Sequence, residues 1–448
     1  MGSKIAGSLA TESKFRVRNG GKISPFQFLC AVCTKAIDGG CSLGNITTTL
    51  SMTVGESISK QGVWKRMTPA ASTFFLLILQ YIIGEKLNSA TVLAKELITF
   101  FPRILLQDSC VIALHKSLFK YYPGSANQNG NCSSLKVQAV YNILDSTFTH
   151  FNMTSFRQND QAAAGKIDFL KKGDLLIRDL GYFSTKAFAK INSLGAFFIS
   201  RLKFGVHIYG EKVKIDPKTK KETAINLLGL LRGRDEIDMN VRLSASMKLP
   251  VRLVGVRLPK DVANKRRREA KENRDKKLKP SQEHLNILSW SLYITNIPKE
   301  TWSVKTIILA YSLRWRIEII FKSWKSCLNF DLKGKMSVNQ VNLLLYSRLI
   351  MITVISAYYY PRFEDKIFKK TGRNLSLIKF VDLIVSSNEG LWELFESKNT
   401  HEKKLARDIL SKNITYEQRK RSNYARELQA LADSAMNDRI TTNIVANK

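Results

Sequence analysis

The segment from Ser303 to Leu328 constrains this chain most, because its residues separate onto two sides of a helix. Successive residues of an α-helix are about 100° apart, and on that spacing the polar and apolar residues form opposite stripes. The polar stripe contains Tyr311, Arg314, Glu318, Lys322 and Lys325, and the apolar stripe contains Leu313, Ile317, Ile320, Phe321, Trp324 and Leu328. We therefore predict one continuous helix with its apolar side packed on a sheet. The polar row runs about 21 Å along the axis, which suits an extended polyanion better than one metal ion.

Glu318 lies among the cations of this row, and spacing alone leaves two interpretations open. A surface carboxylate beside basic residues is commonly half of an ion pair. The alternative is a metal ligand next to a row that binds phosphates. Of the two, spacing alone favours the ion pair.

The net charge of the chain indicates the same kind of partner. The 71 Lys and Arg residues outnumber the 37 Asp and Glu residues, which leaves a net charge of +34. So large an excess repels itself in a compact chain and is usually balanced by a polyanion. Nucleic acid is the first candidate, and an acidic membrane surface is the second.

Two apolar stretches resemble membrane spans but are predicted to be buried core helices. Phe74–Ile83 is too short to cross a bilayer, and Val341–Tyr360 has Arg348 in its middle. The first 22 residues are polar and basic and lack the apolar run of a signal peptide. We therefore expect no membrane association and a cytoplasmic protein.

The six cysteines are sparse, which favours a reducing compartment. Cys30 and Cys33 form a C-x-x-C motif with Cys41 nearby, so a zinc or redox site is one interpretation. None of the five histidines lies near this motif. Small apolar cysteines in a helix are the favoured interpretation.

Along the chain, the apolar pattern changes from helical to strand-like and back. Residues 1–100 show helical spacing, in the segments Ser24–Ile37, Ile46–Thr53 and Thr73–Lys86. From Pro102 we predict strands and one helix, in the segments Arg103–Leu114, Val137–Leu144, Thr147–Met153, Asp174–Asp179, Lys186–Ile191 (the helix) and Phe197–Lys203. Short alternating runs then predict a β-rich insertion over residues 205–300, in the segments Val206–Tyr209, Val251–Arg257 and Leu288–Thr295. Helices resume at Ser303, so the chain is predicted to be α/β.

Two basic segments stand apart from these elements. Glu56–Met67 predicts a short basic helix with serine caps, either a recognition helix for a major groove or a solvated surface helix. Lys260–Lys279 holds ten basic and four acidic residues. It is interpreted as a solvated loop or helix, as an arm that contacts phosphates, or as both. The residues expected to contact DNA in this arm are Lys265, Arg266, Arg267 and Arg268.

The spacing Tyr311-x2-Arg314-x3-Glu318-x6-Lys325 resembles the YREK signature of the insertion-sequence-4 family of DDE transposases. Four residue types at fixed spacing are rarely met by chance. The resemblance therefore implies that Glu318 is a catalytic acid. It also implies that Tyr311, Arg314 and Lys325 contact DNA, and Lys322 in the same row is expected to do so as well.

Other family landmarks have counterparts over roughly residues 100–330. The first catalytic Asp of the family ends an apolar strand, and LLQDSC supplies Asp108. The second precedes Gly-Tyr, and IRDLGYF supplies Asp179. The family also carries a β-rich insertion with a Trp near its end that stacks on a flipped base. Trp290 in LSWSLYITNIP corresponds to it, with a core aromatic as the alternative.

Asp145 is the rival of Asp108 as the first carboxylate. It also follows a predicted strand, in NILDST. However, Asp-Ser is common at hairpin turns for backbone reasons alone. We therefore favour Asp108.

The resemblance implies a ribonuclease H-like catalytic core interrupted by a β-rich insertion, between helical ends. The expected divisions are a helical DNA-binding region (1–100), two core parts (101–204 and 301–370), the insertion with its basic arm (205–300) and a helical region that would pair two chains (371–448).

The implied function is cut-and-paste transposition of an insertion sequence by a prokaryotic, nucleoid-associated homodimer. Its substrates are double-stranded terminal repeats and target DNA, with a hairpin intermediate between cleavage and joining. Asp108, Asp179 and Glu318 would bind two divalent ions, Mg²⁺ with Mn²⁺ as a substitute, since hard cations prefer oxygen ligands. Three alternatives stay open: a nuclease of the same fold, a DNA-binding regulator derived from a transposase, and a membrane-surface protein.

Overall fold

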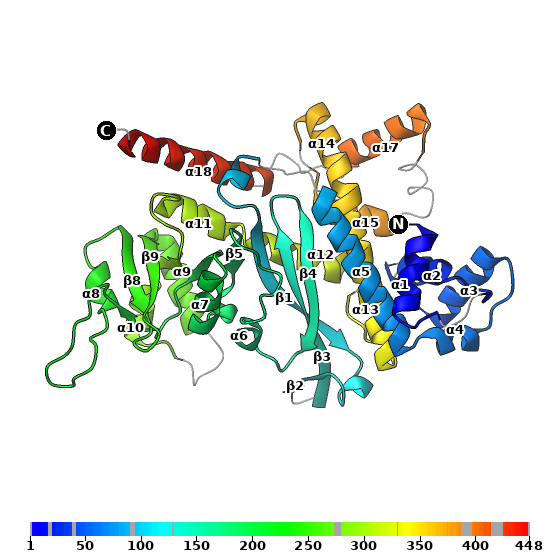
Figure 1. Ribbon diagram of the computed structural model, residues 1–448, viewed down its shortest axis with the longest axis horizontal. Coiled ribbons are helices and arrows are strands. Elements are labelled where there is room, and N and C mark those ends of the chain that lie inside the picture. Colours follow the sequence, from blue (N-terminus) through cyan, green and yellow to red (C-terminus); the bar gives the residue numbers. More distant parts are fainter. Residues whose placement is uncertain are drawn as a thin grey trace. The chain divides into compact units, whose positions relative to one another are not determined.

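The computed structural model describes residues 2–16, 20–37, 42–89, 95–127, 130–272, 279–328, 330–373, 375–386, 397–413 and 424–446. The chain forms two compact units, each built from three segments that are far apart in the sequence (Figure 1). Unit 1 combines residues 1–93, 108–158 and 316–421, and unit 2 combines residues 94–107, 159–315 and 422–448. Ten strands form one mixed sheet, and strand β1 contributes residues to both units.

Unit 1 begins with five helices, as the helical spacing of residues 1–100 predicts. They are α1 (Ser3–Glu12), α2 (Pro25–Ile37), α3 (Leu43–Val54), α4 (Lys60–Arg66) and α5 (Pro69–Ser89). Serine caps set two of the starts, since the Ser42 side chain accepts from Asn45 N and the Ser59 side chain accepts from Gly62 N. Aromatic rings fill the core, with Phe15 stacked on Phe74 at 5.2 Å between centroids.

The strands of unit 1 are the second half of β1 (Ile104–Leu114), β2 (Pro123–Asn127), β3 (Gly130–Asn142) and β4 (Thr147–Ser155). β3 and β4 form the predicted hairpin, with pairing from Leu135–Ser155 to Asn142–Thr147. In its turn, Asp145 Oδ1 accepts hydrogen bonds from Thr147 N at 3.0 Å and Thr147 Oγ1 at 2.6 Å. Asp145 is 8% exposed and holds the turn, so its carboxylate is occupied as the backbone interpretation requires.

The later helices of unit 1 are η2 (Lys116–Leu118), α12 (Trp315–Cys327), α13 (Val338–Thr353), α14 (Tyr360–Thr371), α15 (Leu377–Ser386) and α17 (Thr400–Asn413). A π-helical turn at Val354–Tyr359 joins α13 to α14, so Val338–Thr371 is one 34-residue helix. α13 packs on α2 and α5. Arg348, 3% exposed, donates from Nε to Ala36 O at 2.8 Å, which gives a charged group inside an apolar helix one of its hydrogen bonds.

The helix Val338–Thr371 is long and apolar enough to cross a membrane by length and composition, and 72% of its most apolar stretch is buried inside the protein. Val341, Leu345 and Ile352 are completely buried, as are Phe74 and Ile78 of α5. The prediction that both apolar stretches are core helices is therefore confirmed.

Unit 2 is built on the other strands. These are the first half of β1, β5 (Leu175–Arg178), β6 (Phe197–Arg201), β7 (Ile208–Tyr209), β8 (Glu236–Leu243), β9 (Leu249–Arg257) and β10 (Trp290–Thr295). β5 pairs in parallel with β1 and with β6, and β10 pairs antiparallel with β6 and β9. The strands of the predicted insertion thus extend the sheet through β10, which lies between β6 and β9. β2 and β8 were not predicted.

Short helices connect these strands. They are η1 (Lys95–Thr99), α6 (Asp160–Ala163), η3 (Leu180–Tyr182), α7 (Thr185–Ser193), α8 (Leu227–Leu231), α9 (Lys260–Lys271), α10 (Gln282–Ile287), α11 (Val304–Ser312) and the C-terminal α18 (Tyr424–Ala446). α18 packs on α11. Asp438 Oδ2 accepts from Ser303 N at 2.7 Å and from Thr306 Oγ1 at 2.6 Å, so α18 secures the start of α11.

The prediction of one continuous helix over Ser303–Leu328 is wrong. α11 ends at Ser312 and α12 begins at Trp315. Between them Arg314 N donates to Tyr311 O at 3.1 Å, a bond across three residues that marks a turn tighter than an α-helix. A two-residue turn shifts the angular pattern little, so the apolar spacing passes through the break without revealing it.

Candidate active site

Strands β1 and β5 lead to the two predicted aspartates. They pair residue by residue from Ile104–Leu175 to Gln107–Arg178. The next residues along the chain are Asp108 and Asp179. Asp108 lies within β1 and begins the middle segment of unit 1, and Asp179 lies in unit 2. Each aspartate is therefore the residue that follows the last position at which its own strand pairs with the other.

The Asp179 side chain is 45% exposed and faces the guanidinium of Arg314, with 3.8 Å between Oδ1 and Nε. Gly181 leaves room beside it. A Cβ at Gly181 would lie 3.5 Å from Asp160 Oδ2 and 4.0 Å from Asp179 Oδ2. The sequence analysis missed Asp160, which precedes Asp179 by 19 positions on a different element. The structure thus surrounds Asp179 with a cation and a second carboxylate.

Tyr311 is the centre of a cluster of aromatic and cationic side chains in unit 2. Its ring lies 4.8 Å from the Tyr293 ring, measured between centroids. Arg201 Cζ and Arg314 Cζ lie 5.9 Å and 5.8 Å from the same ring. Tyr311 is 6% exposed, and within the described part of the chain its hydroxyl has no hydrogen-bond partner. Burial raises the pKa of Tyr311 to about 12, and the two arginines oppose that rise.

Arg201 is a candidate phosphate contact that the sequence analysis missed. It ends β6 and is the cross-strand partner of Tyr293. Among the described residues it forms no ion pair, so its charge is not neutralised by a carboxylate contact. Nothing in its local sequence marks it, because only the pairing of β6 with β10 brings it to Tyr311.

The predicted basic arm is a helix, α9, and two of its arginines are engaged with protein. Arg266 Nη1 donates to Ser291 Oγ at 3.2 Å, and burial lowers the pKa of Arg266, with the nearby Arg201 adding to the effect. Arg267 Nε donates to Leu285 O at 3.1 Å. Lys265 and Arg268 are exposed and pair with acidic residues one turn later. Of the predicted segment Lys260–Lys279, residues 273–278 lie outside the described part.

Trp290 is the first residue of β10 and is 7% exposed. It is the cross-strand partner of Arg257, and its carbonyl accepts from Arg266 Nη1 at 3.4 Å. With so little of the side chain exposed, the arrangement supports the alternative interpretation as a core aromatic. Stacking on a flipped base stays a prediction that requires the ring to become accessible.

In unit 1, Glu318 lies in the first turn of α12 and is half-buried. The amino end of a helix favours a negative charge there. Lys322 and Lys325 are exposed on the same helix. Burial raises the pKa of the Cys110 thiol to about 12; Lys325 opposes this rise, while Asp331 and Asp108 add to it. The structure therefore brings Asp108 and Lys325 within electrostatic range of one thiol.

The three predicted carboxylates are divided between the units, since Asp108 and Glu318 belong to unit 1 and Asp179 to unit 2. Within the ranges that the structure describes, no three His, Cys, Asp or Glu side chains form a group that could hold a metal. The C-x-x-C motif forms no such group among the described residues either. Cys30 is exposed, Cys33 is buried in α2, and Cys41 lies outside the described residues. All three predicted ligands are carboxylates, which fits a hard divalent cation.

The family model described as "Transposase DDE domain" matches residues 99–354, more than half of the chain. The chain belongs to the DDE transposase family. These enzymes cleave DNA strands and join them, and the family is generally dependent on divalent metal ions. The match spans Asp108, Asp179 and Glu318 and includes the predicted insertion.

The transposase is also similar to curated proteins. It is 27% identical to the transposase for insertion sequence element IS231F of Bacillus thuringiensis subsp. israelensis over 370 residues, which covers 79% of this chain and 76% of that protein. It is 27% identical to the transposase for IS1151 of Clostridium perfringens, covering 87% and 85%. The putative transposase InsL of IS186A of Escherichia coli K12 is 26% identical, covering 65% and 74%.

One solved structure similar to the transposase is a piggyBac transposase synaptic complex with hairpin DNA. Its TM-score is 0.42 at 10% identity, covering 93% of this chain and 83% of that chain.

In unit 1, α3 and α4 pack on each other where the sequence predicts either a recognition helix or a solvated surface helix. α3 ends at Gly55, whose φ of 76° makes the left-handed turn that suits glycine. α4 follows, with Val63 completely buried and Trp64 54% exposed. Lys60, Gln61 and Lys65 share the exposed side of α4 with Trp64. The exposed side of α4 is therefore basic and polar, with one exposed aromatic ring.

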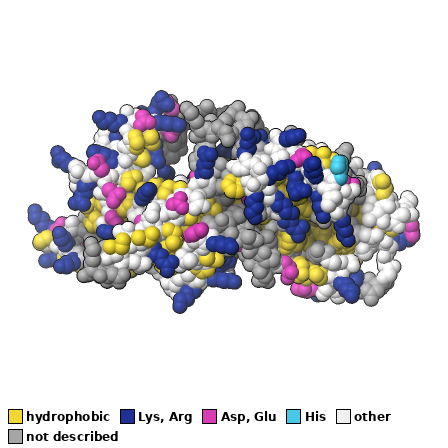
Figure 2. Space-filling model, turned by 90° about the horizontal axis from the view of Figure 1, so that it is seen from above, with side chains coloured by type: hydrophobic (Ala, Val, Ile, Leu, Met, Phe, Trp, Pro, Cys, Tyr) yellow, Lys and Arg dark blue, Asp and Glu magenta, His cyan; other side chains and the backbone are white. Residues whose placement is uncertain are grey.

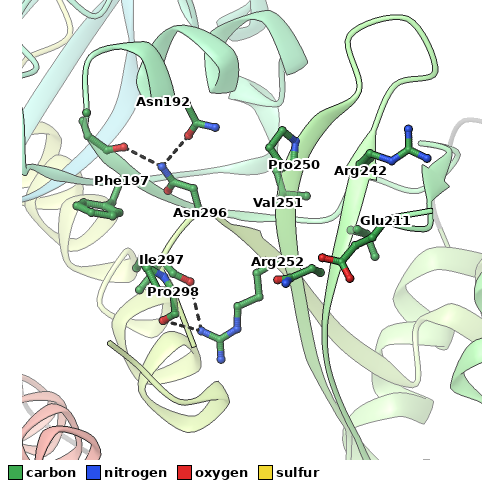
Figure 3. A pocket seen from close by; sticks show the side chains of 14 residues that line it. Asn192, Phe197, Glu211, Arg242, Pro250, Val251, Arg252, Asn296, Ile297 and Pro298 are labelled. Atoms are coloured by element: carbon green, nitrogen blue, oxygen red, sulfur yellow. Dashed lines mark hydrogen bonds between the residues drawn. The ribbon is translucent and has the colours of Figure 1, made fainter. Parts of the chain in front are cut away.

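A hollow of about 660 Å³ in unit 2 is a less suitable ligand site (Figure 3). Asn296 and Arg252, two of its polar side chains, are held by protein partners. Asn296 Nδ2 donates to Asn192 Oδ1 at 2.7 Å, and Arg252 Nη1 donates to Trp302 O at 2.7 Å. Arg252 also pairs with Asp238 at 2.7 Å. These bonds fix the end of β10 against β9, so we interpret the hollow as structural.

Proposed function

We propose that this chain is the transposase of an insertion sequence and moves it by cut-and-paste transposition. It would bind the terminal repeats, cleave both strands through a hairpin intermediate, and join the ends to target DNA. The observation that carries the proposal is the grouping of Tyr311 and Arg314, two signature residues, beside Asp179 in unit 2. Family membership alone gives the reaction class, whereas this grouping supports a preserved active site.

Asp108, Asp179 and Glu318 are the proposed catalytic carboxylates in a ribonuclease H-like core. Bound between them, two Mg²⁺ ions, or Mn²⁺ in their place, would activate the attacking hydroxyl and neutralise charge on the phosphate. Asp179 is suited to this role because its carboxylate is 45% exposed. Without a cation, three such carboxylates at close range would raise one another's pKa and resist full ionisation.

The arginines around Tyr311 are proposed to grip the phosphate next to the cleaved bond. Arg314 offers a planar fork that binds phosphate through two parallel hydrogen bonds. Arg201 lies on the same aromatic ring and has no ion-pair partner among the described residues. The buried Tyr311 hydroxyl is free to donate to a phosphate oxygen. Lys325 in unit 1 would act as a point charge toward another phosphate.

Recognition of the terminal repeats is proposed for α4, through Gln61, Lys65 and Trp64. Gln reads adenine in the major groove and Lys contacts guanine or phosphate, while an aromatic ring contacts the thymine methyl. Pairing of two ends would need two copies of the chain. A DNA substrate in a bacterial cell places the enzyme in the cytoplasm at the nucleoid.

A cleavage assay with point variants tests the proposal. The protein is incubated with a labelled duplex that carries its own element's end, in Mg²⁺, Mn²⁺ or EDTA. We expect metal-dependent cutting at the element boundary. Asp108→Ala, Asp179→Ala and Glu318→Ala should each abolish cutting and leave binding of the end largely intact.

Two controls separate the other interpretations. A nuclease would cut but would not join the cut end to a second duplex, which a strand-transfer step reveals. A regulator would bind the end and cut in no metal. Retained cutting in any of the three alanine variants would remove that residue from the active site.

A further inference from the structure

A second basic surface lies at the other end of unit 1 from α4, on α14 and α17. Figure 2 shows Lys and Arg side chains gathered over these two helices. On α14, the residues Arg362, Lys366 and Lys369 are exposed and fall within about 60° of one another around the axis. On α17, Lys403, Lys404 and Arg407 are exposed and fall within about 100°. We call these six residues the α14–α17 face.

The two basic rows belong to one surface because α14 and α17 are linked. Lys370 Nζ pairs with Asp408 Oδ1 at 2.8 Å, and this contact lowers the pKa of Asp408 below its ordinary value. Ile367 of α14 and Leu410 of α17 are completely buried on their inner sides. The helices therefore lie side by side with their basic rows outward.

Two lysines of this face have no acidic partner among the described residues. Lys366 and Lys403 form no ion pair with any residue that the structure describes. The exposed apolar side chains Phe368 and Leu405 lie about 100° or more around each helix axis from the basic residues. A membrane-binding helix needs an exposed apolar stripe opposite its cations. Here Ile367, Ala406 and Leu410 are buried inside the protein, so the face fits a phosphate backbone better than a lipid surface.

The α14–α17 face is far from α4. α2 meets the long helix at Arg348, and α17 meets it at Lys370, 22 positions later and about 33 Å along the axis. α3 packs on α2, and α4 packs on α3. Figure 1 shows α4 and α17 at opposite ends of unit 1. A straight duplex whose end is bound by α4 would not also lie on the α14–α17 face.

We propose that the α14–α17 face binds a second duplex, the target DNA, through its phosphates and without regard to sequence. The inference rests on the proposed function, since only a strand-joining enzyme must hold two DNA molecules at once. Phosphate contacts position a duplex and carry no sequence information, which suits a target.

The test neutralises four lysines of the face, in the variant Lys366→Gln, Lys369→Gln, Lys403→Gln and Lys404→Gln. The matched control removes the same charge from an exposed loop of unit 2, in the variant Lys212→Gln, Lys214→Gln, Lys218→Gln and Lys220→Gln. Cleavage of the element end, joining of pre-cut ends to a plasmid, and binding to an unrelated duplex at several salt concentrations are measured for each.

We expect the α14–α17 variant to cut the element end like wild type and to join pre-cut ends about tenfold less well at physiological salt. Its log-log salt slope for the unrelated duplex should fall by about 3.6, since each of the four lost phosphate contacts removes about 0.9. The control should change neither quantity. Arginine at the four positions keeps the charge and should restore joining, which separates lost charge from a folding defect.

Three results would overturn the proposal: unchanged joining with an unchanged salt slope, equal losses in the control variant, or a loss of dimer in sedimentation with the salt slope intact. A wild-type protein that cuts no DNA would instead refute the proposed function. The salt-slope comparison would then still decide whether this face binds a duplex.

Discussion

The buried hydroxyl of Tyr311 allows a sharp test of the active-site assignment. Tyr311→Phe removes only this hydroxyl and keeps the ring contacts with Tyr293, Arg201 and Arg314. A buried hydroxyl without a hydrogen bond costs about 1–3 kcal/mol of folding free energy. We therefore expect the variant to be more stable by about 1 kcal/mol or more and to cleave its DNA more slowly.

Thermal unfolding gives the magnitude of this effect. For a unit of this size, 1 kcal/mol shifts the midpoint by about 2–4 °C, so the transition of unit 2 should move upward. The matched control is Tyr360→Phe in unit 1, where the hydroxyl is buried and donates to Leu375 O at 2.7 Å. Losing that satisfied bond should cost about 1 kcal/mol. The unfolding midpoint should thus rise in Tyr311→Phe and fall in Tyr360→Phe.

The pH dependence supplies a second readout for Tyr311. Its pKa is raised to about 12 from 10.0 by burial. A raised pKa in the folded state means that ionisation favours the unfolded chain. The free energy of unfolding of the wild type should therefore fall as pH rises from about 10 to 12, and that of Tyr311→Phe should lack this fall. If Tyr311→Phe is less stable than wild type, or cleaves DNA at the wild-type rate, the Tyr311 hydroxyl does not serve as a hydrogen-bond donor to the DNA.

Three further predictions concern other buried groups. Asp145→Ala should destabilise the hairpin by about 1–2 kcal/mol because two hydrogen bonds are lost, and abolished cleavage in a folded variant would restore Asp145 as a catalytic candidate. The Cys110 thiol, with a pKa of about 12, should be alkylated at pH 8 more slowly than Cys30, whose pKa is also raised by burial but whose side chain is exposed; mass spectrometry of peptides measures both rates. Asp174→Asn breaks a buried pair with Arg103 and should cost about 3–5 kcal/mol in urea unfolding; a loss below 1 kcal/mol would contradict a tight pair.

Much of the local structure follows from the sequence, because it depends on neighbours in the chain. Apolar runs predict β1, β5 and β6, and helical spacing predicts α2, α3 and α5. The hairpin at Asp145 was predicted from turn chemistry and is confirmed. The spacing from Tyr311 to Lys325 predicted the family, and the family model confirms it. The catalytic roles of Asp108, Asp179 and Glu318 stay predictions.

The sequence did not reveal what depends on pairing between distant segments. Arg201 and Asp160 carry no local signal. Arg201 meets Tyr311 only because β6 pairs with β10, and Asp160 lies near Gly181 only because α6 packs beside η3. The burial of Trp290 and the anchoring of Arg266 follow from the place of β10 within the sheet. The break between α11 and α12 was also hidden. Periodicity records which side of an element is apolar, whereas which charges share one site is decided by contacts between segments far apart in the chain.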